Sequence, residues 1–98
     1  MSQTMSRSRC HVATDHASRY LQQLCKHWAH KFEVSFDPQQ GRILMTEDRE
    51  VTMTATPTAL EISLSAPAEA LTHLQDVVDS HIIRFAFREE LAFDWQPA

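Results

Sequence analysis

Glycine is almost absent from this chain, which has a single glycine among its 98 residues. Glycine-rich phosphate loops and the nucleophile elbow of many hydrolases each need more than one glycine at a fixed spacing. The sequence therefore contains neither motif. Cysteine is also scarce, and Cys10 and Cys25 stand apart without forming a CxxC pair. Because no feature indicates secretion, we expect two reduced, apolar thiols rather than a disulfide.

Long hydrophobic runs are missing as well. No stretch approaches the roughly 20 apolar residues of a membrane-spanning helix. Arg7 and Arg9 are not followed by the apolar segment of a signal peptide, so we expect a cytoplasmic protein. Positive charge is in deficit, because the net charge is -4 with neutral histidines. This deficit argues against a nucleic-acid partner, since phosphate backbones require a basic surface.

The composition is that of one globular domain. A hydrophobic fraction of 43% and a length of 98 residues suit a single modest core that needs no structural metal. Residues 1–6 are polar and lack periodicity, so we predict a disordered tail there. Residues 7–98 are predicted to form the domain.

Histidine, in contrast, is plentiful, with six copies in the chain. Helical spacing in residues 15–31 predicts a helix with two distinct faces. The polar row on one face consists of His16, Gln23, His27 and His30. The apolar row consists of Ala17, Leu21, Leu24, Cys25 and Trp28. We therefore expect the helix to seal a core with one face and to leave its imidazoles in water on the other.

Alternation of apolar and polar residues predicts strands over much of the remaining chain. Residues 7–13 form the first strand, and Thr14 or Asp15 serves as the N-cap of the helix that follows. Four further strands are predicted at residues 32–37, 42–45, 50–56 and 60–65. The turns between them are too short for parallel crossovers, so the sheet is antiparallel.

A second amphipathic helix is predicted after the strands, with Ser65 as its N-cap and apolar positions that continue to Phe85. Residues 91–95 alternate again, and they either add a short C-terminal strand or fold their aromatic rings onto the sheet edge. The prediction is an α+β fold with the order β-α-β-β-β-β-α. Two amphipathic helices pack on one face of a single antiparallel sheet of four to five strands.

His27 and His30 are three residues apart, a helical spacing that brings two imidazoles within reach of one metal ion. A transition-metal site needs three or four ligands, and no HExxH, CxxC or facial-triad pattern supplies the others. Two interpretations stay open: a metal site, and two half-exposed histidines favoured at a helix C-terminus by the macrodipole. His81 in the second helix is a third candidate imidazole, or a buried histidine with an ordinary hydrogen-bond partner.

Other side chains with binding chemistry lie near these histidines. Tyr20 is predicted between the apolar and the histidine faces, where its ring packs and its hydroxyl stays available. Arg84 and Arg88 are four residues apart and suit a carboxylate or phosphate. We favour an internal ion-pair network instead, because Glu89 and Glu90 follow directly. No serine, cysteine or lysine has the adjacent base that a nucleophile needs, so no catalytic residues are predicted.

Two stretches carry a resemblance to a known family: SRYLQQLCKHWAHK at residues 18–31 and HIIRFAFREE at residues 81–90. Over about residues 9–95, the chain resembles the small bacterial family named domain of unknown function 2218. Members of that family are often encoded near siderophore uptake systems, and the domain occurs joined to siderophore-interacting flavin reductases. The resemblance thus implies an accessory part in iron acquisition. It also implies a shared surface made of Arg19, Tyr20, His27, His30, Lys31, His81, Arg84 and Arg88.

Three hypotheses for the function follow. The leading one is a cytoplasmic, non-enzymatic accessory domain of iron or siderophore metabolism. In it, His27, His30 and His81 contact a siderophore, haem, a metal ion or an anionic ligand that Arg19 and Lys31 attract. The second is a protein-interaction module that docks a siderophore-interacting reductase or a transporter component. The third is a small lyase or hydrolase, for which the sequence offers no substrate.

Overall fold

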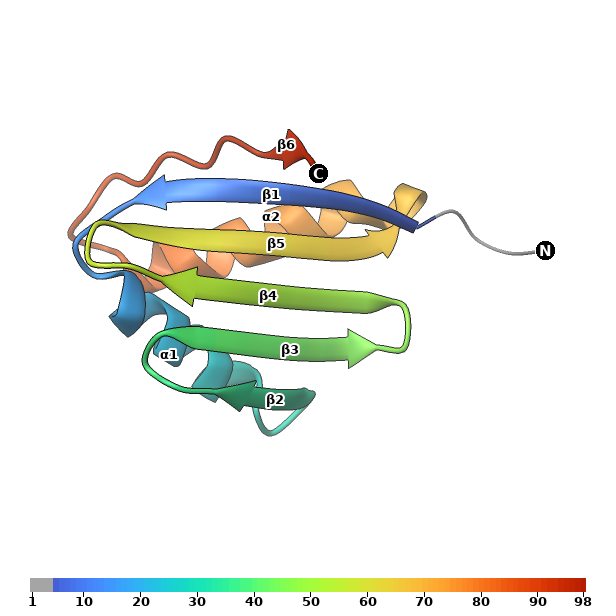
Figure 1. The fold of residues 1–98 in the computed structure, drawn as a ribbon, viewed down its shortest axis with the longest axis horizontal. Helices are drawn as coiled ribbons and strands as arrows, with labels where there is room; N and C mark the ends of the chain where they lie inside the picture. Colours follow the sequence, from blue (N-terminus) through green and yellow to red (C-terminus); the bar gives the residue numbers. More distant parts are fainter. Residues whose placement is uncertain (1–4) are drawn as a thin grey trace.

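Residues 5–98 are described by a computed structural model of the protein (Figure 1). Met5 and Ser6 belong to the first strand, so the prediction of a disordered tail was wrong for these two residues. They are ordered because they pair with Pro67 and Ala66 of a neighbouring strand. The rest of the predicted tail, residues 1–4, lies outside the described residues.

The order of elements confirms the predicted α+β fold. The chain runs through β1 (Met5–Ala13), α1 (Ala17–Trp28), β2 (Glu33–Phe36), β3 (Gln40–Thr46), β4 (Arg49–Ala55), β5 (Ala59–Pro67), α2 (Ala68–Phe85) and β6 (Gln96–Pro97). All strands belong to one antiparallel sheet in the order β2-β3-β4-β5-β1-β6. The sheet has six strands because β6 adds the short C-terminal strand, one more than the upper predicted number.

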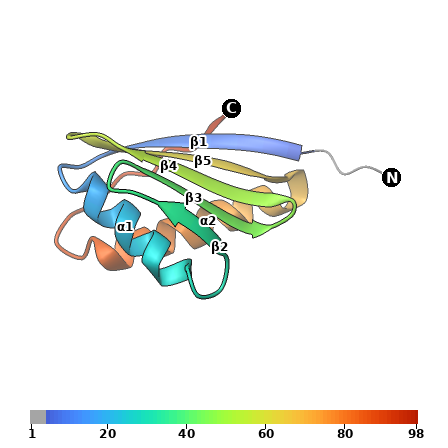
Figure 2. The same cartoon turned by 60° about the horizontal axis from the view of Figure 1, so that its bottom comes forward.

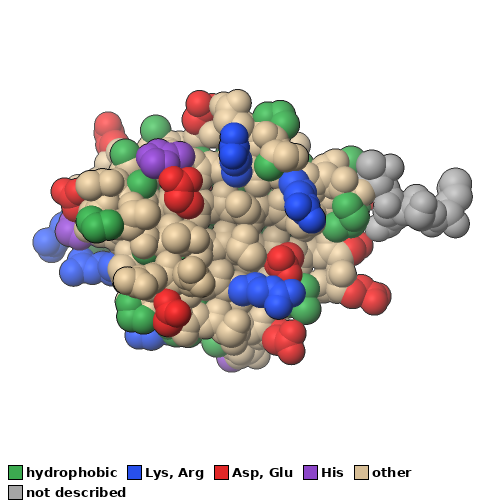
Figure 3. Space-filling model, in the orientation of Figure 1, with side chains coloured by type: hydrophobic (Ala, Val, Ile, Leu, Met, Phe, Trp, Pro, Cys, Tyr) green, Lys and Arg blue, Asp and Glu red, His purple; other side chains and the backbone are tan. Residues whose placement is uncertain are grey.

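The two faces of the sheet differ in polarity. In β4, Val51 and Met53 are buried, whereas Thr54, the residue after Met53, is exposed. In β5, Ile62 and Leu64 are buried in the same way. Both helices cover the apolar face and lie beneath the sheet in Figure 2. The opposite face is open in Figure 3, with charged side chains scattered over it, and residues such as Thr52, Thr54 and Ser63, which alternate with the buried positions of β4 and β5, belong to it. One face of the sheet is therefore dry and the other is in contact with water.

Helix α1 packs very closely on β3 at Gly41. A Cβ atom at this position would lie 2.8 Å from Cys25 Sγ and 3.1 Å from Leu21 Cδ2. The only glycine of the chain is thus required because α1 packs against it and leaves no room for a side chain, and not because a turn needs its backbone conformation. Leu21 and Cys25 are fully buried in this contact, and burial of a leucine side chain stabilises a fold by about 1.5–3 kcal/mol.

The predicted N-caps of both helices were wrong. His16 takes the cap position of α1 without a side-chain hydrogen bond, and Thr14 instead accepts a hydrogen bond from the His16 amide at 3.1 Å. Ser65 lies within β5, where it pairs with Arg7, and Pro67 takes the cap position of α2. The strand extends past Ser65 because β1 begins early enough to continue the ladder of hydrogen bonds to Pro67.

The chain after α2 returns along β1 at the edge of the sheet (Figure 1). Trp95 fixes this segment, because its Nε1–H group donates to both carboxylate oxygens of Asp79 at 2.9 and 3.1 Å. Gln96 and Pro97 then pair with Arg9 and Ser8. The predicted strand at residues 91–95 is thus displaced toward the C-terminus, while the rings of Phe93 and Trp95 pack against the core. No helix within residues 5–98 is long and apolar enough to cross a membrane.

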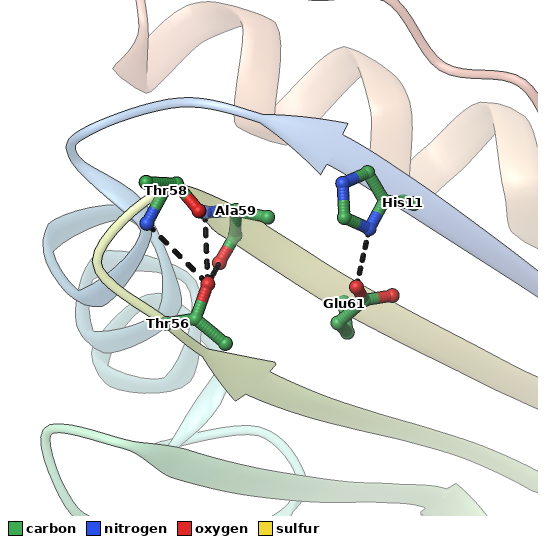
Figure 4. A network of polar contacts seen from close by, with 5 residues as sticks. All are labelled: His11, Thr56, Thr58, Ala59 and Glu61. Carbon is green, nitrogen blue, oxygen red and sulfur yellow. Dashed lines mark hydrogen bonds and ion pairs between the residues drawn. The ribbon is translucent and has the colours of Figure 1, made fainter.

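Two separate sets of polar contacts lie on the open face and in the turn after β4 (Figure 4). His11 of β1 contacts the Glu61 carboxylate of β5 through Nδ1, and both side chains are exposed, so the pair contributes little stability. In the turn, Thr56 Oγ1 accepts hydrogen bonds from the amides of Thr58 and Ala59 at 3.4 and 3.0 Å. His11 lies on the face of the sheet opposite to the helices, because it alternates with Cys10 and Val12, which are buried beneath the sheet.

Candidate functional site

The polar row of α1 is exposed and its apolar row is buried, as the helical spacing predicted. The exposed row comprises His16, Gln23, His27 and His30. The buried row comprises Ala17, Leu21, Leu24, Cys25 and Trp28, and Tyr20 is buried with them. The helix is shorter than predicted and ends at Trp28, so His30 and Lys31 lie in the turn that follows it.

The C-terminal end of α1 borders a pocket of about 530 Å³, within the range typical of small-molecule sites. Three parts of the chain form its walls. Helix α1 and its following turn contribute His27, Trp28, His30, Lys31 and Phe32, and the β3–β4 hairpin contributes Met45, Thr46 and Arg49. Helix α2 contributes Ala70, His73, Leu74, Val77 and His81, which share one face of the helix. We call this space the histidine pocket.

The two helices bring their imidazoles together at this pocket. The ring centroids of His27 and His81 are 5.2 Å apart, and those of His27 and His30 are 6.4 Å apart. The ring centroids of Trp28 and His81 are 5.0 Å apart, so the tryptophan ring packs against this histidine. The structure thus brings imidazoles of α1 and α2 together, a relationship that the sequence left open.

His81 is held in one orientation by its own helix. Its Nδ1 atom lies 2.7 Å from the carbonyl oxygen of Val77, the residue one turn earlier. Since a carbonyl oxygen only accepts hydrogen bonds, Nδ1 carries the proton and donates it. The neutral ring then leaves Nε2 free to accept a hydrogen bond or to bind a cation, and the protonated ring offers Nε2–H to an anion.

The turn after α1 places two more lining residues. The amides of Lys31 and Phe32 both donate to the Trp28 carbonyl oxygen, at 3.0 and 2.8 Å, which folds the chain back over the end of the helix. Lys31 Nζ lies 5.5 Å from the centre of the Phe32 ring, within the range of a cation–π contact. A helix C-terminus favours nearby cations through its macrodipole, which explains how Lys26, His27 and Lys31 are tolerated together.

Charge in the histidine pocket has a single sign. Its walls carry four histidines, one lysine and one arginine, and none of the described residues that line it is an aspartate or glutamate. Within residues 5–98, the ion pairs join His11 to Glu61 and Arg42 to Glu50, so neither Lys31 nor Arg49 has an acidic partner there. The permanently charged residues that line the pocket, Lys31 and Arg49, are thus both basic, although the net charge of the protein is -4.

Comparison with known proteins gives a family but no activity. Residues 9–96 match the model of the family described as an uncharacterised protein conserved in bacteria, DUF2218. The chain belongs to the DUF2218 family. The NMR structure of PA4090 from Pseudomonas aeruginosa is similar to this chain, with a TM-score of 0.79 and 44% sequence identity over 95% of this chain and 97% of PA4090. No curated protein matches the chain. The predicted membership is confirmed, and the siderophore association stays a prediction.

Four of the eight site residues predicted for this DUF2218 chain line the histidine pocket: His27, His30, Lys31 and His81. The other four, Arg19, Tyr20, Arg84 and Arg88, do not line it. The pocket thus brings together the imidazoles and the lysine of the predicted surface. It leaves the arginines and the tyrosine at other places in the fold.

Tyr20 has a structural contact with the segment after α2. Its hydroxyl donates to the Glu89 carboxylate, which also accepts hydrogen bonds from the Thr14 hydroxyl at 3.0 and 3.1 Å. Burial, followed by this hydrogen bond to Glu89, raises the pKa of Tyr20 to about 12. Tyr20 therefore connects the start of the helix layer to the chain that follows α2.

The predicted ion-pair network around Arg84 and Arg88 is not present among the described residues. Glu89, which was expected to neutralise these arginines, instead accepts hydrogen bonds from Tyr20 and Thr14. Arg88 lies 5.3 Å from the centre of the Phe87 ring. The arginines are thus exposed at the end of α2 and its following turn.

Two basic lining residues, His73 and Arg49, were not among the predicted site residues. His73 is exposed and lies off the main apolar stripe of α2, so the apolar periodicity does not select it, yet its spacing from Val77 and His81 places all three on one face. This spacing was a usable signal. Arg49 enters the site through the pairing of β3 with β4, where the register shifts between Leu44 and Thr46. Nothing in the local sequence indicates that this hairpin reaches the helices.

The predicted metal site at His27 and His30 stays a prediction. Among residues 5–98, no group of three or more histidine, cysteine, aspartate or glutamate side chains is arranged to hold a metal ion. The two thiols lie elsewhere, since Cys10 and Cys25 are buried and free, as expected. Burial raises the pKa of each thiol to about 11, so neither is a ready nucleophile or metal ligand.

Proposed function

We propose that this protein is a non-enzymatic accessory domain that binds an anionic ligand, or iron carried as an anionic chelate, in the histidine pocket. In this proposal the ligand is held by His27, His30, His81 and Lys31, and we include His73 and Arg49 because they line the same pocket. The observation that carries the proposal is the accumulation of cationic and imidazole side chains around one cavity without a carboxylate among its described lining residues.

This arrangement of basic side chains favours the binding of an anion. Like charges gathered around a concave, partly apolar wall repel one another, and an anion relieves that repulsion. Imidazoles donate hydrogen bonds to an anion from whichever ring nitrogen is protonated. A role in iron or siderophore metabolism is supported by the family resemblance, and an anionic iron chelate or the propionates of haem suit the charge of the pocket.

Titration calorimetry tests the proposal with ferric citrate, haem, Zn²⁺ and inorganic phosphate as separate probes. We expect at least one anionic probe to bind the intact chain, and the double variant His27→Ala, His30→Ala to lose at least about tenfold in affinity, or 1.4 kcal/mol. The matched control is the double variant His11→Ala, His16→Ala, which removes two exposed imidazoles outside the pocket. Binding should be unchanged in this control.

Two results would overturn the proposal. One is the absence of binding for all of the anionic probes. The other is an equal loss of affinity in the pocket variant and in the control variant. Tight binding of Zn²⁺ alone, lost in the pocket variant, would replace the anion site by the metal site that the spacing of His27 and His30 predicts.

A second candidate function, docking of a partner protein such as a siderophore-interacting reductase, is favoured by a different surface. Ile83 and Phe87 near the end of α2 are 53% and 77% exposed, and exposed apolar groups beside arginines are common at protein interfaces. The test is binding of a purified siderophore-interacting reductase to the double variant Ile83→Ser, Phe87→Ser. Loss of binding with an intact fold supports docking, and unchanged binding contradicts it.

A further inference from the structure

We infer that the ligand of the histidine pocket is an organic acid with a sizeable apolar body rather than a small hydrophilic anion such as phosphate. The inference rests on the proposed function and specifies the chemical class of its ligand. It depends on the composition of the pocket walls, which combine an apolar surface with a basic one. A small ion can contact only the basic surface.

The first kind of surface is apolar and belongs to the inner part of the walls. Trp28 and Leu74 are only 5% and 4% exposed, so they lie at the base of the pocket. Phe32, Met45 and Val77 are half-buried around them and pack against the core. These side chains come from α1 and the turn after it, from β3 and from α2, so each part of the chain that lines the pocket contributes apolar surface.

The second kind of surface is cationic and lies farther out. Lys31, Arg49 and His73 are exposed, and they come from the turn after α1, from β4 and from α2 respectively. Two cationic groups and one imidazole therefore flank the apolar base, one from each of these three parts of the chain. A ligand whose acidic group lies at the mouth meets these cations, while the remainder of the ligand reaches Trp28 and Leu74.

Each simpler ligand leaves part of this surface unsatisfied. A small hydrophilic ion contacts the cations but leaves the apolar base wet, so it gains nothing from that surface. A neutral apolar molecule covers the base but takes water away from cationic groups without replacing it, which is costly. Only a ligand with both an acidic group and an apolar body uses the whole pocket.

The volume agrees with such a ligand. A cavity of about 530 Å³ is far larger than one water-sized ion requires, since a water molecule occupies about 30 Å³ in the liquid. Small-molecule sites of this size are usually lined by apolar and aromatic groups with a few charged or polar side chains that fix the orientation. The histidine pocket has this composition.

Three probes separate the contributions in the intact chain: acetate, 2-naphthoate and the neutral 2-naphthalenemethanol. Acetate carries the acidic group alone, the alcohol carries the apolar body alone, and naphthoate carries both. We expect naphthoate to bind at least about tenfold more tightly than either of the others, a difference of 1.4 kcal/mol. Fluorescence of the naphthyl group and calorimetry measure the dissociation constants.

Matched variants locate the two surfaces. Lys31→Met should weaken naphthoate and acetate several-fold and leave the alcohol unchanged, whereas Lys26→Met on the exposed side of α1 should change nothing. Met45→Gln should weaken naphthoate and the alcohol and leave acetate unchanged, with Met5→Gln as its control on the exposed end of β1. Circular dichroism confirms that each variant is folded.

The outcomes distinguish this inference from the proposed function. If acetate binds as tightly as naphthoate, or the alcohol does, the inference is overturned. If naphthoate fails to bind while ferric citrate or phosphate binds through His27 and His30, the inference is wrong and the proposed function stands. If no anion binds, both are wrong.

Discussion

The imidazole rings of His27 and His81 lie with their centroids 5.2 Å apart and their planes inclined by 56°, although one belongs to α1 and the other to α2. Trp28 packs on His81 and Phe85 lies 6.1 Å from His27, so aromatic groups surround the pair. Side chains packed in this way lose rotamer freedom before any ligand arrives. The ring of His81, which also donates to the Val77 carbonyl oxygen, is therefore held in place, and a group held in this way lowers the entropic cost of binding.

Gly41→Ala tests the close approach of α1 to the sheet. The added methyl would lie 2.8 Å from Cys25 Sγ, so we expect a loss of about 1–3 kcal/mol in the free energy of unfolding through overpacking. Urea denaturation measures the loss. Combining the change with Cys25→Ala should recover part of it, because the sulfur atom is removed, and strictly additive effects would contradict the assigned clash.

Tyr20→Phe tests the contact between α1 and Glu89. The raised tyrosine pKa of about 12 means that the folded state keeps its phenol proton more firmly than the unfolded state, whose tyrosine pKa is about 10. Tyr20 thus contributes stability that is fully present below pH 10 and is lost as the pH rises toward 12. The contribution is at most about 2–3 kcal/mol.

The measurement for Tyr20 is the free energy of unfolding from pH 8 to pH 12. The wild-type chain should lose more stability over this range than Tyr20→Phe, which keeps the ring and lacks the titrating group. Titration of the buried thiols is common to both proteins and cancels in the comparison. Parallel curves for the two proteins would show that the hydroxyl has no such role.

Asp79→Asn tests the contact that fixes the C-terminal segment. Burial raises the pKa of Asp79, the hydrogen bond from Trp95 opposes this effect, and Asp76 adds to it. Since the folded carboxyl group takes up a proton more readily than the unfolded one, the wild-type chain gains stability relative to the variant as the pH falls through the raised pKa. We expect the variant to be at least as stable as wild type at pH 7.

The advantage of Asp79→Asn should shrink toward pH 3 in thermal denaturation. Glu33→Gln is the control, because Glu33 is exposed on β2 and interacts with neither Asp79 nor Trp95. A variant that is much less stable than wild type at pH 7 would show that the charge of Asp79 is needed to hold Trp95.

Reactivity of the thiols tests the burial of Cys10 and Cys25. The side chains are 1% and 0% exposed, and burial raises both pKa values to about 11. We expect neither thiol to react with a disulfide reagent at pH 8 in the native state, and both to react in guanidinium chloride. Rapid reaction of either one in the native state would mean that the core opens easily or is packed differently.

Much of the fold follows from periodicity in the sequence, because burial of one face of each element is a local property. The rows of α1 separate as predicted, with Leu21 and Leu24 buried and His27 and His30 exposed. Helix starts were less accurate, since Ser65 has the chemistry of an N-cap but is taken up by the ladder between β5 and β1. A tertiary contact outweighs a local preference there.

The site was predicted only in part for a related reason. Helical spacing identifies the histidines of α1, but the approach of Arg49 depends on sheet pairing, which joins distant parts of the chain. The separation of Arg84 and Arg88 from the pocket depends on where α2 crosses the sheet and on Glu89 binding to Tyr20. The spacing of residues along the sequence predicts neither the approach of Arg49 to the helices nor the contact between Glu89 and Tyr20.

The most direct test is NMR of the six imidazole side chains while the intact protein is titrated with 2-naphthoate. Four of them line the histidine pocket, and the other two, His11 and His16, lie outside it as internal references. Binding in the pocket predicts saturable chemical-shift changes at His27, His30, His73 and His81, with His11 and His16 unchanged. Equal changes at all six rings, or no change in the pocket rings at saturating naphthoate, would contradict the account.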